Sequence, residues 1–498
     1  MANTIKKTTT SSFSLTLRLN TSDNDIKILE KRFDIARHLY NVCVKEARRR
    51  VNSFKKDKEY KRLMKIFAIN KKFSSEEKEI LRQLRVKYDL EGKYSLEKYL
   101  NRCRKKFRKY IDADTCCGIA QTAWKAVDSY LYKNGKKIHF KNDYGFDSVS
   151  SKTNKQGIIF RENAIKWLDL KIPVFIRNND NYAKKCLLEH RIKLCRIKRK
   201  WYKHNYRYYA ELVLEGKPPL KNRHSSNGEV GIDIGTSTIA AVSRYGVLFK
   251  ELGEEAQYIS KEISRLNRKS DRQRRANNPQ NYNKNGTIRK NTKNFKRKWY
   301  YSKKHRLTLD RIHYLYRLRT DLIKQSHNRL ANQILTMGDC IYIEDLNFEA
   351  MKRKSKELKK SKKTGRLVRR KRYGKTIREH CPGTLVLKLA ERAKLLDCSF
   401  NKVNTNISKA SKLNHITQEY VSSDINSRWK TIDKNIKVQR DLYSAFLLSN
   451  SDTSSIIDTK KCENNFMFFY YYHNAIIKEM QRLKYNGKYY PSSMGIRI

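Results

Sequence analysis

The spacing of hydrophobic residues changes along the chain and divides it into regions with different predicted elements. Near the start, hydrophobic and polar residues alternate from Phe13 to Leu19, which predicts a strand with one buried face. Ser22 and Asp25 then form a capping-box pattern, which is typical of a helix start. From there to about Tyr132, apolar residues recur every three or four positions with Lys and Arg between them. This region predicts a basic helical domain inserted after one strand.

Alternation returns between Ile138 and Leu214, in short segments that predict the strands of a compact β-rich domain. We expect the first strand of the chain to belong to the same domain. Pro and Gly gather in residues 216–228, which indicates a linker, and a new domain is expected from about Glu229. The clearest alternating segments are Gly157–Arg161, Lys171–Ile176 and Tyr208–Leu214.

An acid stands in the middle of an apolar stretch, V-G-I-D-I-G-T-S-T-I-A-A-V, at residues 230–242. The pattern predicts a buried strand that ends near Asp233, a tight turn at Gly235, and a returning strand. A carboxylate in an apolar strand is costly unless it is paired or binds a metal. Asp233 is therefore a candidate metal ligand, and a carboxylate held by the amides of the turn is the alternative.

Two further acids follow at comparable places. Cys340–Ile343 is expected to be another buried strand, and it ends in Glu344. Val438–Leu448 predicts a helix with Asp441 near its start, and the small Ala445 one turn later would let the helix lie close to a sheet. Three other acids near these positions are alternatives to Asp441 as the third acid of the site, and they are Asp345, Asp424 and Asp433.

The charge of the chain favours a nucleic acid as partner. Its 498 residues contain 112 Lys and Arg against 49 Asp and Glu, a net charge of +63. A surface so basic binds phosphates with release of counterions, so its binding weakens steeply with salt. The hydrophobic fraction of 39% and the 6 Pro indicate packed domains.

Basic residues that alternate with aromatic residues, or cluster along a helix, are candidates for nucleic-acid contacts. For the aromatic residues, packing within a strand is an equally good alternative. The long basic segment from Lys352 to Lys375 is expected to be a solvated loop. The candidates are Trp201, Tyr202, Lys203, Arg207, Arg268, Arg272, Arg274, Arg275 and Arg440.

Several other classes of protein are disfavoured. The chain has no stretch of 18 consecutive apolar residues and no apolar segment at its start, so we expect neither a membrane span nor secretion. Its 10 Cys show no C-x-x-C pair, which favours reduced thiols in an intracellular protein. We find no P-loop, HExxH or G-x-S-x-G motif. The D-x-G-T turn also occurs in actin-like and sugar-kinase ATPases, but the second phosphate loop of those proteins is missing.

Acids on a first strand, a later strand and a closing helix match the arrangement of the ribonuclease-H-like fold. In such a site carboxylates converge on two Mg²⁺ ions that promote phosphodiester hydrolysis. The expected fold class is α+β multidomain, with a β-barrel-like domain that carries a helical insertion and an α/β ribonuclease-H-like nuclease domain.

Three segments together resemble the RuvC motifs of miniature type V CRISPR nucleases and their TnpB transposon-associated relatives. They are G-I-D-I-G-T-S, I-Y-I-E-D-L-N-F-E-A-M and V-Q-R-D-L-Y-S-A-F-L-L. The form of the third segment and the long helical insertion are most similar to type V-F effectors.

This resemblance implies an RNA-guided DNA endonuclease with Asp233, Glu344 and Asp441 as catalytic and metal-binding acids. It further implies two Mg²⁺ ions, for which Mn²⁺ can substitute, and the prokaryotic cytoplasm as the site of action. The implied partners are a guide RNA, the target DNA as duplex and displaced single strand, and a second copy of the chain on the same guide RNA.

The same resemblance assigns domains along the chain. A wedge domain is expected in residues 1–22 and 137–215, a helical recognition domain in 23–136, and a linker in 216–228. A RuvC nuclease domain is expected in 229–400 and 433–498, with a target-nucleic-acid-binding insert in 401–432.

The insert departs from the family pattern. Relatives commonly carry a four-Cys zinc knuckle there, whereas the interval between the second and third acids offers only Cys381 and Cys398, with His380 and His415 scattered. We therefore predict no structural zinc and expect packing to hold the insert. A TnpB-like nuclease and a guided DNA-binding repressor without nuclease activity remain alternatives. The apolar stretch from Ile119 to Leu131 is a candidate dimer surface, with an ordinary helix core as the alternative.

Overall fold

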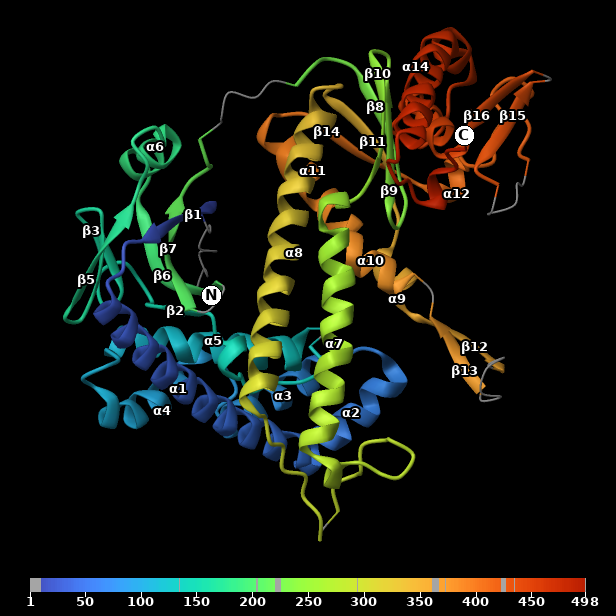
Figure 1. Ribbon diagram of the computed structural model, residues 1–498. Coiled ribbons are helices and arrows are strands. Elements are labelled where there is room, and N and C mark those ends of the chain that lie inside the picture. Colours follow the sequence, from blue (N-terminus) through green and yellow to red (C-terminus); the bar gives the residue numbers. More distant parts are fainter. Residues whose placement is uncertain are drawn as a thin grey trace. The chain divides into compact units, whose positions relative to one another are not determined.

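The computed structural model describes residues 10–133, 135–202, 205–219, 225–292, 294–360, 367–371, 373–421, 427–433 and 435–497. The chain divides into two compact units, Met1–Lys221 and Asn222–Ile498 (Figure 1). The division lies inside the segment predicted to be a linker. Each unit combines helices with a sheet, so the expectation of a mixed α and β protein is confirmed.

Unit 1 contains a seven-stranded antiparallel sheet in the order β2-β6-β7-β1-β5-β4-β3. The strands β2 and β3 form its two edges, and β3 also contacts β6, so the sheet curves into a half-barrel and confirms the expected barrel-like domain in part. The first strand of the chain pairs with β5 and β7, as expected from its alternation. The strands are β1 (Ser12–Leu19), β2 (Ser148–Ser150), β3 (Ile159–Arg161), β4 (Ala164–Trp167), β5 (Leu170–Phe175), β6 (Ile192–Tyr202) and β7 (Asn205–Glu215).

The helices of unit 1 follow β1, as the apolar spacing predicts. Ser22 and Asp25 form the expected capping box at the start of the first helix. Breaks between helices fall at polar turns, and Asp112 caps the last long helix through the amide of Thr115. The helices are α1 (Asp23–Lys56), α2 (Lys58–Asn70), α3 (Ser75–Lys87), α4 (Lys93–Arg104), α5 (Ala113–Tyr132) and α6 (Asn181–Glu189).

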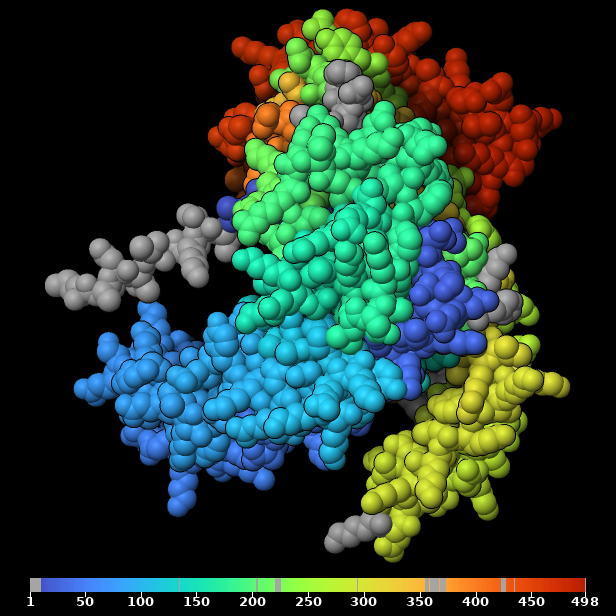
Figure 2. Space-filling model, turned by 90° about the vertical axis from the view of Figure 1, so that its left-hand side faces the viewer, coloured from blue at the N-terminus to red at the C-terminus, as the bar shows by residue number. Residues whose placement is uncertain are grey.

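One hydrophobic core joins the helices and the sheet of unit 1. Phe33 of α1 and Trp167 of β4 are both completely buried in it. Arg32 is buried too, and its guanidinium donates to the carbonyl of Trp167 and forms an ion pair with Asp169. In Figure 2 the helical part, in blue, and the β part, in teal and green, adjoin in one continuous surface. The helical insertion is therefore packed onto the sheet.

Unit 2 contains a five-stranded mixed sheet in the order β10-β9-β8-β11-β14. The strands β8, β9 and β10 form an antiparallel meander, and β11 and β14 continue the sheet parallel to β8. Two separate hairpins are formed by β12 with β13 and by β15 with β16. The strands are β8 (Glu229–Ile234), β9 (Thr238–Ser243), β10 (Gly246–Glu251), β11 (Cys340–Glu344), β12 (Lys354–Lys360), β13 (Leu367–Lys371), β14 (Ser399–Val403), β15 (Trp429–Asp433) and β16 (Ile436–Gln439).

Helices cover both faces of the five-stranded sheet. Side chains of α8 and α11 pack on one face with Ile232 and Ile341, and side chains of α13 and α14 pack on the other with Ala240 and Tyr342. Helices α7 and α8 run side by side away from the sheet as a long hairpin (Figure 1). The helices are α7 (Gln257–Asn277), α8 (Lys303–Leu335), α9 (Phe348–Lys352), α10 (Gly374–His380), α11 (Pro382–Leu395), α12 (Thr405–Ser408), α13 (Arg440–Ser449) and α14 (Thr459–Tyr485).

Two sequence-based predictions for unit 2 were wrong in detail. The helix expected from Val438 begins at Arg440, because Val438 pairs with Lys430 in the β15–β16 hairpin. The basic segment expected to be a loop, Lys352–Lys375, contains the strands β12 and β13, and its two ends overlap the last residue of α9 and the start of α10. Among the described residues, no helix is long and apolar enough to cross a membrane.

Candidate functional site

Strand pairing places the first two acids on the same face of the sheet. β8 and β11 are parallel neighbours, with Ile232 opposite Ile343. Side chains alternate between faces, and both isoleucines point to the α8 and α11 side. The next residues along the two strands, Asp233 and Glu344, therefore point to the side covered by α13.

Helix α13 brings the third acid to the same side. Gln439 caps the helix by accepting a hydrogen bond from the amide of Leu442, and this cap places Asp441 in the first turn. The helix lies directly on β8, because Gly231 has no side chain there. A Cβ atom at Gly231 would lie 2.0 Å from the carbonyl oxygen of Ala445 and 2.2 Å from the nitrogen of Ser449.

The three acids line one cavity of about 740 Å³, which we call the acid cavity. Its wall also contains the β8–β9 turn from Gly235 to Thr238. In this turn the amide of Gly235 donates to the carbonyl of Thr238, so that amide is engaged within the turn itself. Three basic residues line the cavity as well, and they are Lys412, Arg428 and Arg440.

Burial and mutual repulsion disfavour the ionised form of the acids. The pKa of Asp233 is raised well above its usual value, first by burial and then by the charges of Glu344 and Asp441. Arg440 and Arg428 offset part of this effect. The pKa of Glu344 is raised by burial and by the charge of Asp441. A bound cation would relieve this repulsion, which is the electrostatic signature of a functional site.

Arg440 contacts the third acid directly. Its guanidinium lies 3.3 Å from Oδ1 of Asp441 and donates to the carbonyl of Ser427 at 3.1 Å. Both side chains are largely buried. This ion pair holds Asp441 at the rim of the acid cavity and keeps a positive charge beside it.

The acids of the cavity suit Mg²⁺ if they are divided between two ions and the substrate supplies the remaining ligands. In the described part of the chain, no three His, Cys, Asp or Glu side chains are close enough together to hold one metal ion. Mg²⁺ usually keeps several waters and takes one or two carboxylates together with phosphate oxygens of the substrate. The acids of the cavity fit this mode of binding, in which the ligands are divided between ions and the substrate completes each shell.

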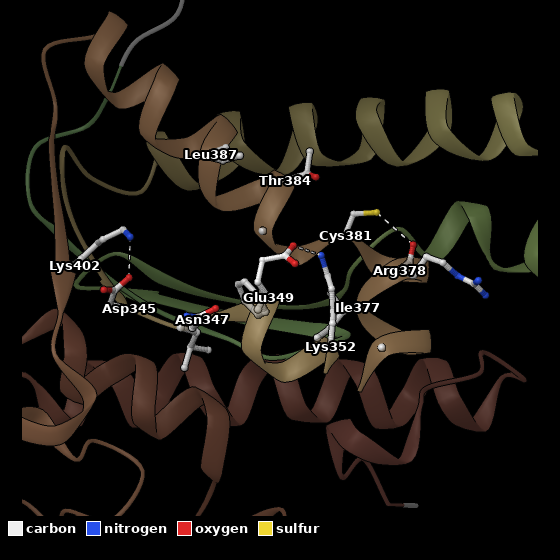
Figure 3. Close-up of a pocket in the computed structure, with 14 residues that line it drawn as sticks. Asp345, Asn347, Glu349, Lys352, Ile377, Arg378, Cys381, Thr384, Leu387 and Lys402 are labelled. Carbon is white, nitrogen blue, oxygen red and sulfur yellow. Dashed lines mark hydrogen bonds and ion pairs between the residues drawn. The ribbon is translucent and has the colours of Figure 1, made fainter. Parts of the chain in front are cut away.

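Two of the three competing acids lie outside the acid cavity. Asp345 is half-exposed and forms an ion pair of 2.7 Å with Lys402, as Figure 3 shows. Asp345 follows Glu344 and so points away from the face that carries the acid cavity. Asp433 is exposed at the end of β15. Asp424 lies outside the described residues.

A second cavity of about 900 Å³ adjoins the first, and Leu346 lines both. Figure 3 shows its polar side chains, which include the ion pair between Glu349 and Lys352. Cys381 is also at its wall, in a left-handed conformation with φ of 51° between α10 and α11. This second cavity has a mixed polar and apolar lining and is distinct from the acid cavity.

The predicted aromatic contacts on unit 1 lie on the β6–β7 hairpin. Trp201 packs edge-on against Tyr206 at 4.9 Å between ring centroids. The guanidinium of Arg207 lies 3.4 Å from the ring centroid of Tyr202. These residues pack on one another across the hairpin, and their contact with nucleic acid stays a prediction. Lys203 lies outside the described residues.

Four of the five predicted arginines of unit 2 lie along α7, and the fifth, Arg440, is the first residue of α13. Arg268, Arg272 and Arg275 are exposed. Arg274 forms an ion pair of 3.0 Å with Asp271 and its guanidinium lies 5.6 Å from the ring centroid of Trp299. The exposed arginines leave one side of the helix positively charged.

Polar contacts hold the 401–432 insert. Lys430 is almost completely buried, and its ammonium donates to the carbonyls of Lys412 at 2.9 Å and Leu413 at 2.8 Å. The backbone amide of His415 donates to the hydroxyl of Tyr443 on α13, and Asn414 donates to the carbonyl of Ile432. The wall of the acid cavity at Lys412 is thereby fixed to β15.

Sequence reasoning missed Gly231, Lys412, Arg428 and Lys430 as residues that shape the site. Gly231 lies in the quoted strand, and only the position of α13 gives it a role. Lys430 carries no recognisable signal because its partners are backbone carbonyls. Lys412 and Arg428 stand in an irregular region without periodicity.

The apolar stretch considered for dimerisation is mostly internal. Ile119, Ala120, Ala123 and Val127 of α5 are buried in the core of unit 1. Helix α5 packs against α1 and α4. This face of α5 is therefore an ordinary helix core, and it does not supply a surface for a second copy.

No protein-family model matches the sequence, and no curated protein matches it. Among solved structures, the chain is similar to one described as a cryo-EM structure of the Cas12f1-sgRNA-target DNA complex. That likeness has 13% sequence identity and a TM-score of 0.41, and it covers 89% of this chain and 99% of the other. A second, a CRISPR-Cas12f ternary complex, has 13% identity, a TM-score of 0.25 and coverage of 87% and 86%. Both TM-scores are below 0.5, so neither likeness carries weight in assigning a fold or a function.

Proposed function

We propose that the protein is an RNA-guided, Mg²⁺-dependent DNA endonuclease of the type V CRISPR kind, with a ribonuclease-H-like core in unit 2 and one site at the acid cavity. The observation that carries the proposal is the meeting of three acids from β8, β11 and α13 in one cavity, where burial and repulsion raise the pKa of Asp233 and Glu344. The net charge of +63 supports nucleic acid as the substrate.

The acids of the cavity would hold the metal. Asp233, Glu344 and Asp441 would supply carboxylate oxygens, which are the ligands that Mg²⁺ prefers. When bound, a pair of such ions supplies a hydroxide at neutral pH and stabilises the leaving oxygen of a phosphodiester. Metal binding requires the carboxylates in their ionised form, so the raised pKa values couple binding to the release of protons.

The basic residues of the cavity would position the substrate. Arg428, Arg440 and Lys412 stand around the carboxylates and would contact the phosphates on either side of the bond to be cut. Arg440 also keeps Asp441 in place through its ion pair. Sequence specificity would come from pairing between the guide RNA and the target strand.

A cleavage assay tests this proposal. RNA that co-purifies with the protein is sequenced, a matching duplex DNA is made, and cutting is followed with Mg²⁺ present. We expect Asp233→Ala and Glu344→Ala to lower the cutting rate by more than 1000-fold while guided DNA binding is kept. Asp345→Ala, one residue from Glu344 but outside the acid cavity, is the matched control and should cut at a rate close to that of the unchanged protein.

Cutting at an unchanged rate by either cavity variant would overturn the site assignment. Guided binding without any cutting by the unchanged protein would favour a DNA-binding repressor. Co-purified RNA that carries a transposon end in place of CRISPR repeats would favour a TnpB-like nuclease.

A further inference from the structure

The loop between α7 and α8, which we call the tip loop, spans residues 278–302, and its described residues 278–292 and 294–302 are held by hydrogen bonds of their own. Asn278 is completely buried at its start. The amide group of Asn278 donates to the carbonyls of Arg274 at 3.0 Å and Tyr300 at 2.9 Å, and it accepts from the amide of Tyr300 at 2.6 Å. A single side chain thus joins the beginning and the end of the loop.

A second asparagine repeats this arrangement. Asn281 is 1% exposed, and its amide donates to the carbonyl of Lys298 at 2.6 Å. Tyr282 pairs with Ile288 in a β-bridge and packs edge-on against Trp299. The tip loop is therefore held by amide hydrogen bonds and a few rings, which leaves its charged side chains on the outside.

All charged residues of the tip loop are basic. From Arg272 to Leu309 the sequence contains 13 Lys and Arg and no Asp or Glu. The lysines and arginine at positions 284, 289, 290, 296 and 298 are exposed. Within the described part of the chain, none of these five side chains forms an ion pair with a carboxylate, although many exposed cations elsewhere do. Such a surface is complementary to phosphate groups.

An aromatic ring stands among these charges. Tyr300 is 64% exposed, although its backbone is fixed at both polar atoms by Asn278. Lys298 on one side and Lys303 on the other are exposed as well. An exposed ring on a fixed backbone between lysines is the arrangement on which an unpaired base stacks.

The position of the tip loop separates it from the acid cavity. Gly253, just before α7, packs against Ile323 of α8, which lies 20 residues from the start of that helix at Lys303. At 1.5 Å per residue this distance is about 30 Å. A strand bound at the tip loop is therefore separate from the bond that the acid cavity would cut, so the guide RNA is the fitting occupant.

We propose that the tip loop binds a single-stranded segment of RNA, with its lysines and arginines on the phosphates and Tyr300 stacked on a base. Naming the guide RNA as the source of that segment rests on the proposed function. The binding chemistry itself depends only on the tip loop.

The test measures binding of a fluorescent 20-nucleotide single-stranded RNA of mixed sequence to the full-length protein, by anisotropy over a range of salt. The tip variant Lys284→Gln/Arg289→Gln/Lys290→Gln should bind about tenfold more weakly and lower the slope of log Kd against log salt by about 2. The matched control, Lys58→Gln/Lys61→Gln/Lys65→Gln on α2, removes three exposed charges as well and should change Kd less than twofold. Equal effects of the two triple variants would overturn the proposal.

Stacking is tested separately at Tyr300. Tyr300→Ala should weaken RNA binding about tenfold, and Tyr300→Phe, which keeps the ring, should bind like the unchanged protein. Unchanged binding by Tyr300→Ala with an unchanged Tm would contradict stacking. Tighter binding of a matching single-stranded DNA than of RNA would contradict the choice of RNA.

The outcome is independent of the nuclease proposal. Weaker RNA binding by the tip variants, together with no DNA cutting by the unchanged protein, would support RNA binding at the tip loop and refute the nuclease proposal. DNA cutting by the unchanged protein, together with unchanged RNA binding by the tip variants, would support the nuclease proposal and refute RNA binding at the tip loop.

Discussion

Glu46 in unit 1 and Asp233 in unit 2 are both shielded acids in helix-covered parts of the chain, and their surroundings are opposite. Glu46 accepts from Arg49 at 2.7 Å and from Arg50 at 2.9 Å, and these partners lower its pKa to about 2. Asp233 faces two other acids, and its pKa is raised. The ionised form of Glu46 therefore stabilises the fold of unit 1, whereas the ionised form of Asp233 is unfavourable in the acid cavity of unit 2.

The difference indicates what holds the acid cavity open for a ligand. The carboxylates in the acid cavity repel one another, so packing contacts with the surrounding residues must hold them in place. Two contacts supply that packing: the close approach of α13 to β8 at Gly231, and the hydrogen bonds of Lys430 to the insert. Breaking either contact should affect unit 2 and leave unit 1 intact.

The largest effect is expected from Gly231→Ala. The added methyl group would overlap backbone atoms of α13, which cannot move without separating the helix from the sheet. We expect unit 2 to lose about 3 kcal/mol or more of stability. Thermal unfolding followed by circular dichroism measures this loss. Gly246→Ala in β10 is the control, since no atom lies within 4 Å of a Cβ there, and its Tm should stay within about 2 °C of the unchanged protein.

A smaller effect is expected from Lys430→Met. This change leaves the carbonyl of Leu413 buried without a donor, at a cost of about 2 kcal/mol, whereas the carbonyl of Lys412 still accepts from the amide of Val421. Lys437→Met, on the exposed side of the neighbouring strand, should cost less than about 0.5 kcal/mol. Denaturant unfolding at pH 7 compares the two variants, and equal midpoints would refute the role of Lys430.

The same lysine gives a pH dependence. Burial lowers the pKa of Lys430 to about 8, below its value in the unfolded chain. The unfolded chain therefore binds more protons above pH 8, and the contribution of Lys430 to stability rises from pH 8 to about 10.5. Lys430→Met should remove this rise from the stability curve, which unfolding at several pH values would detect.

The smallest effects are expected when the two compared acids are neutralised, and they should have opposite signs. Asp233→Asn removes a charge whose pKa is raised by burial and repulsion, so without metal it should stabilise the fold by about 1 kcal/mol at pH 7. Glu46→Gln removes ion pairs and should destabilise the fold by about 1 kcal/mol. Unfolding in a chelator measures both, and a loss of stability in both variants would refute the contrast.

The pH windows of the two acids also differ. A lowered pKa gives Glu46 a contribution that is complete above about pH 5 and is lost as the pH falls towards 2. A raised pKa has the reverse effect, so the contribution of Asp233 worsens as the pH rises above about 4.

Much of this arrangement could be predicted from the sequence, because alternation and burial are local signals. Asp233 and Glu344 were predicted at strand ends, and the parallel pairing of β8 with β11 puts them on one face. The start of α13 was predicted two residues too early, since the pairing of Val438 with Lys430 is not a local property. The assignment of seven segments of the chain to the expected domains and linker stays a prediction.

The remaining parts of the site depend on contacts between distant segments. The role of Gly231 appears only when α13 lies on it, and Lys430 interacts with backbone carbonyls that any residue could offer. The same limit applies to the tip loop. Its basic residues can be read directly from the sequence. The hydrogen bonds of its asparagines cannot, because they connect residues about 20 positions apart.

The binding of Mn²⁺ shows whether the acid cavity is a metal site, because Mn²⁺ can stand for Mg²⁺ and is detected by electron paramagnetic resonance. The full-length protein is titrated with Mn²⁺ at pH 7.5 in the presence of a non-cleavable phosphorothioate DNA strand. We expect the unchanged protein to bind Mn²⁺ with release of protons, and we expect Asp233→Asn/Glu344→Gln to weaken this binding at least tenfold while Asp345→Asn does not. Equal Mn²⁺ binding by the double variant and the unchanged protein would contradict a metal site at the acid cavity.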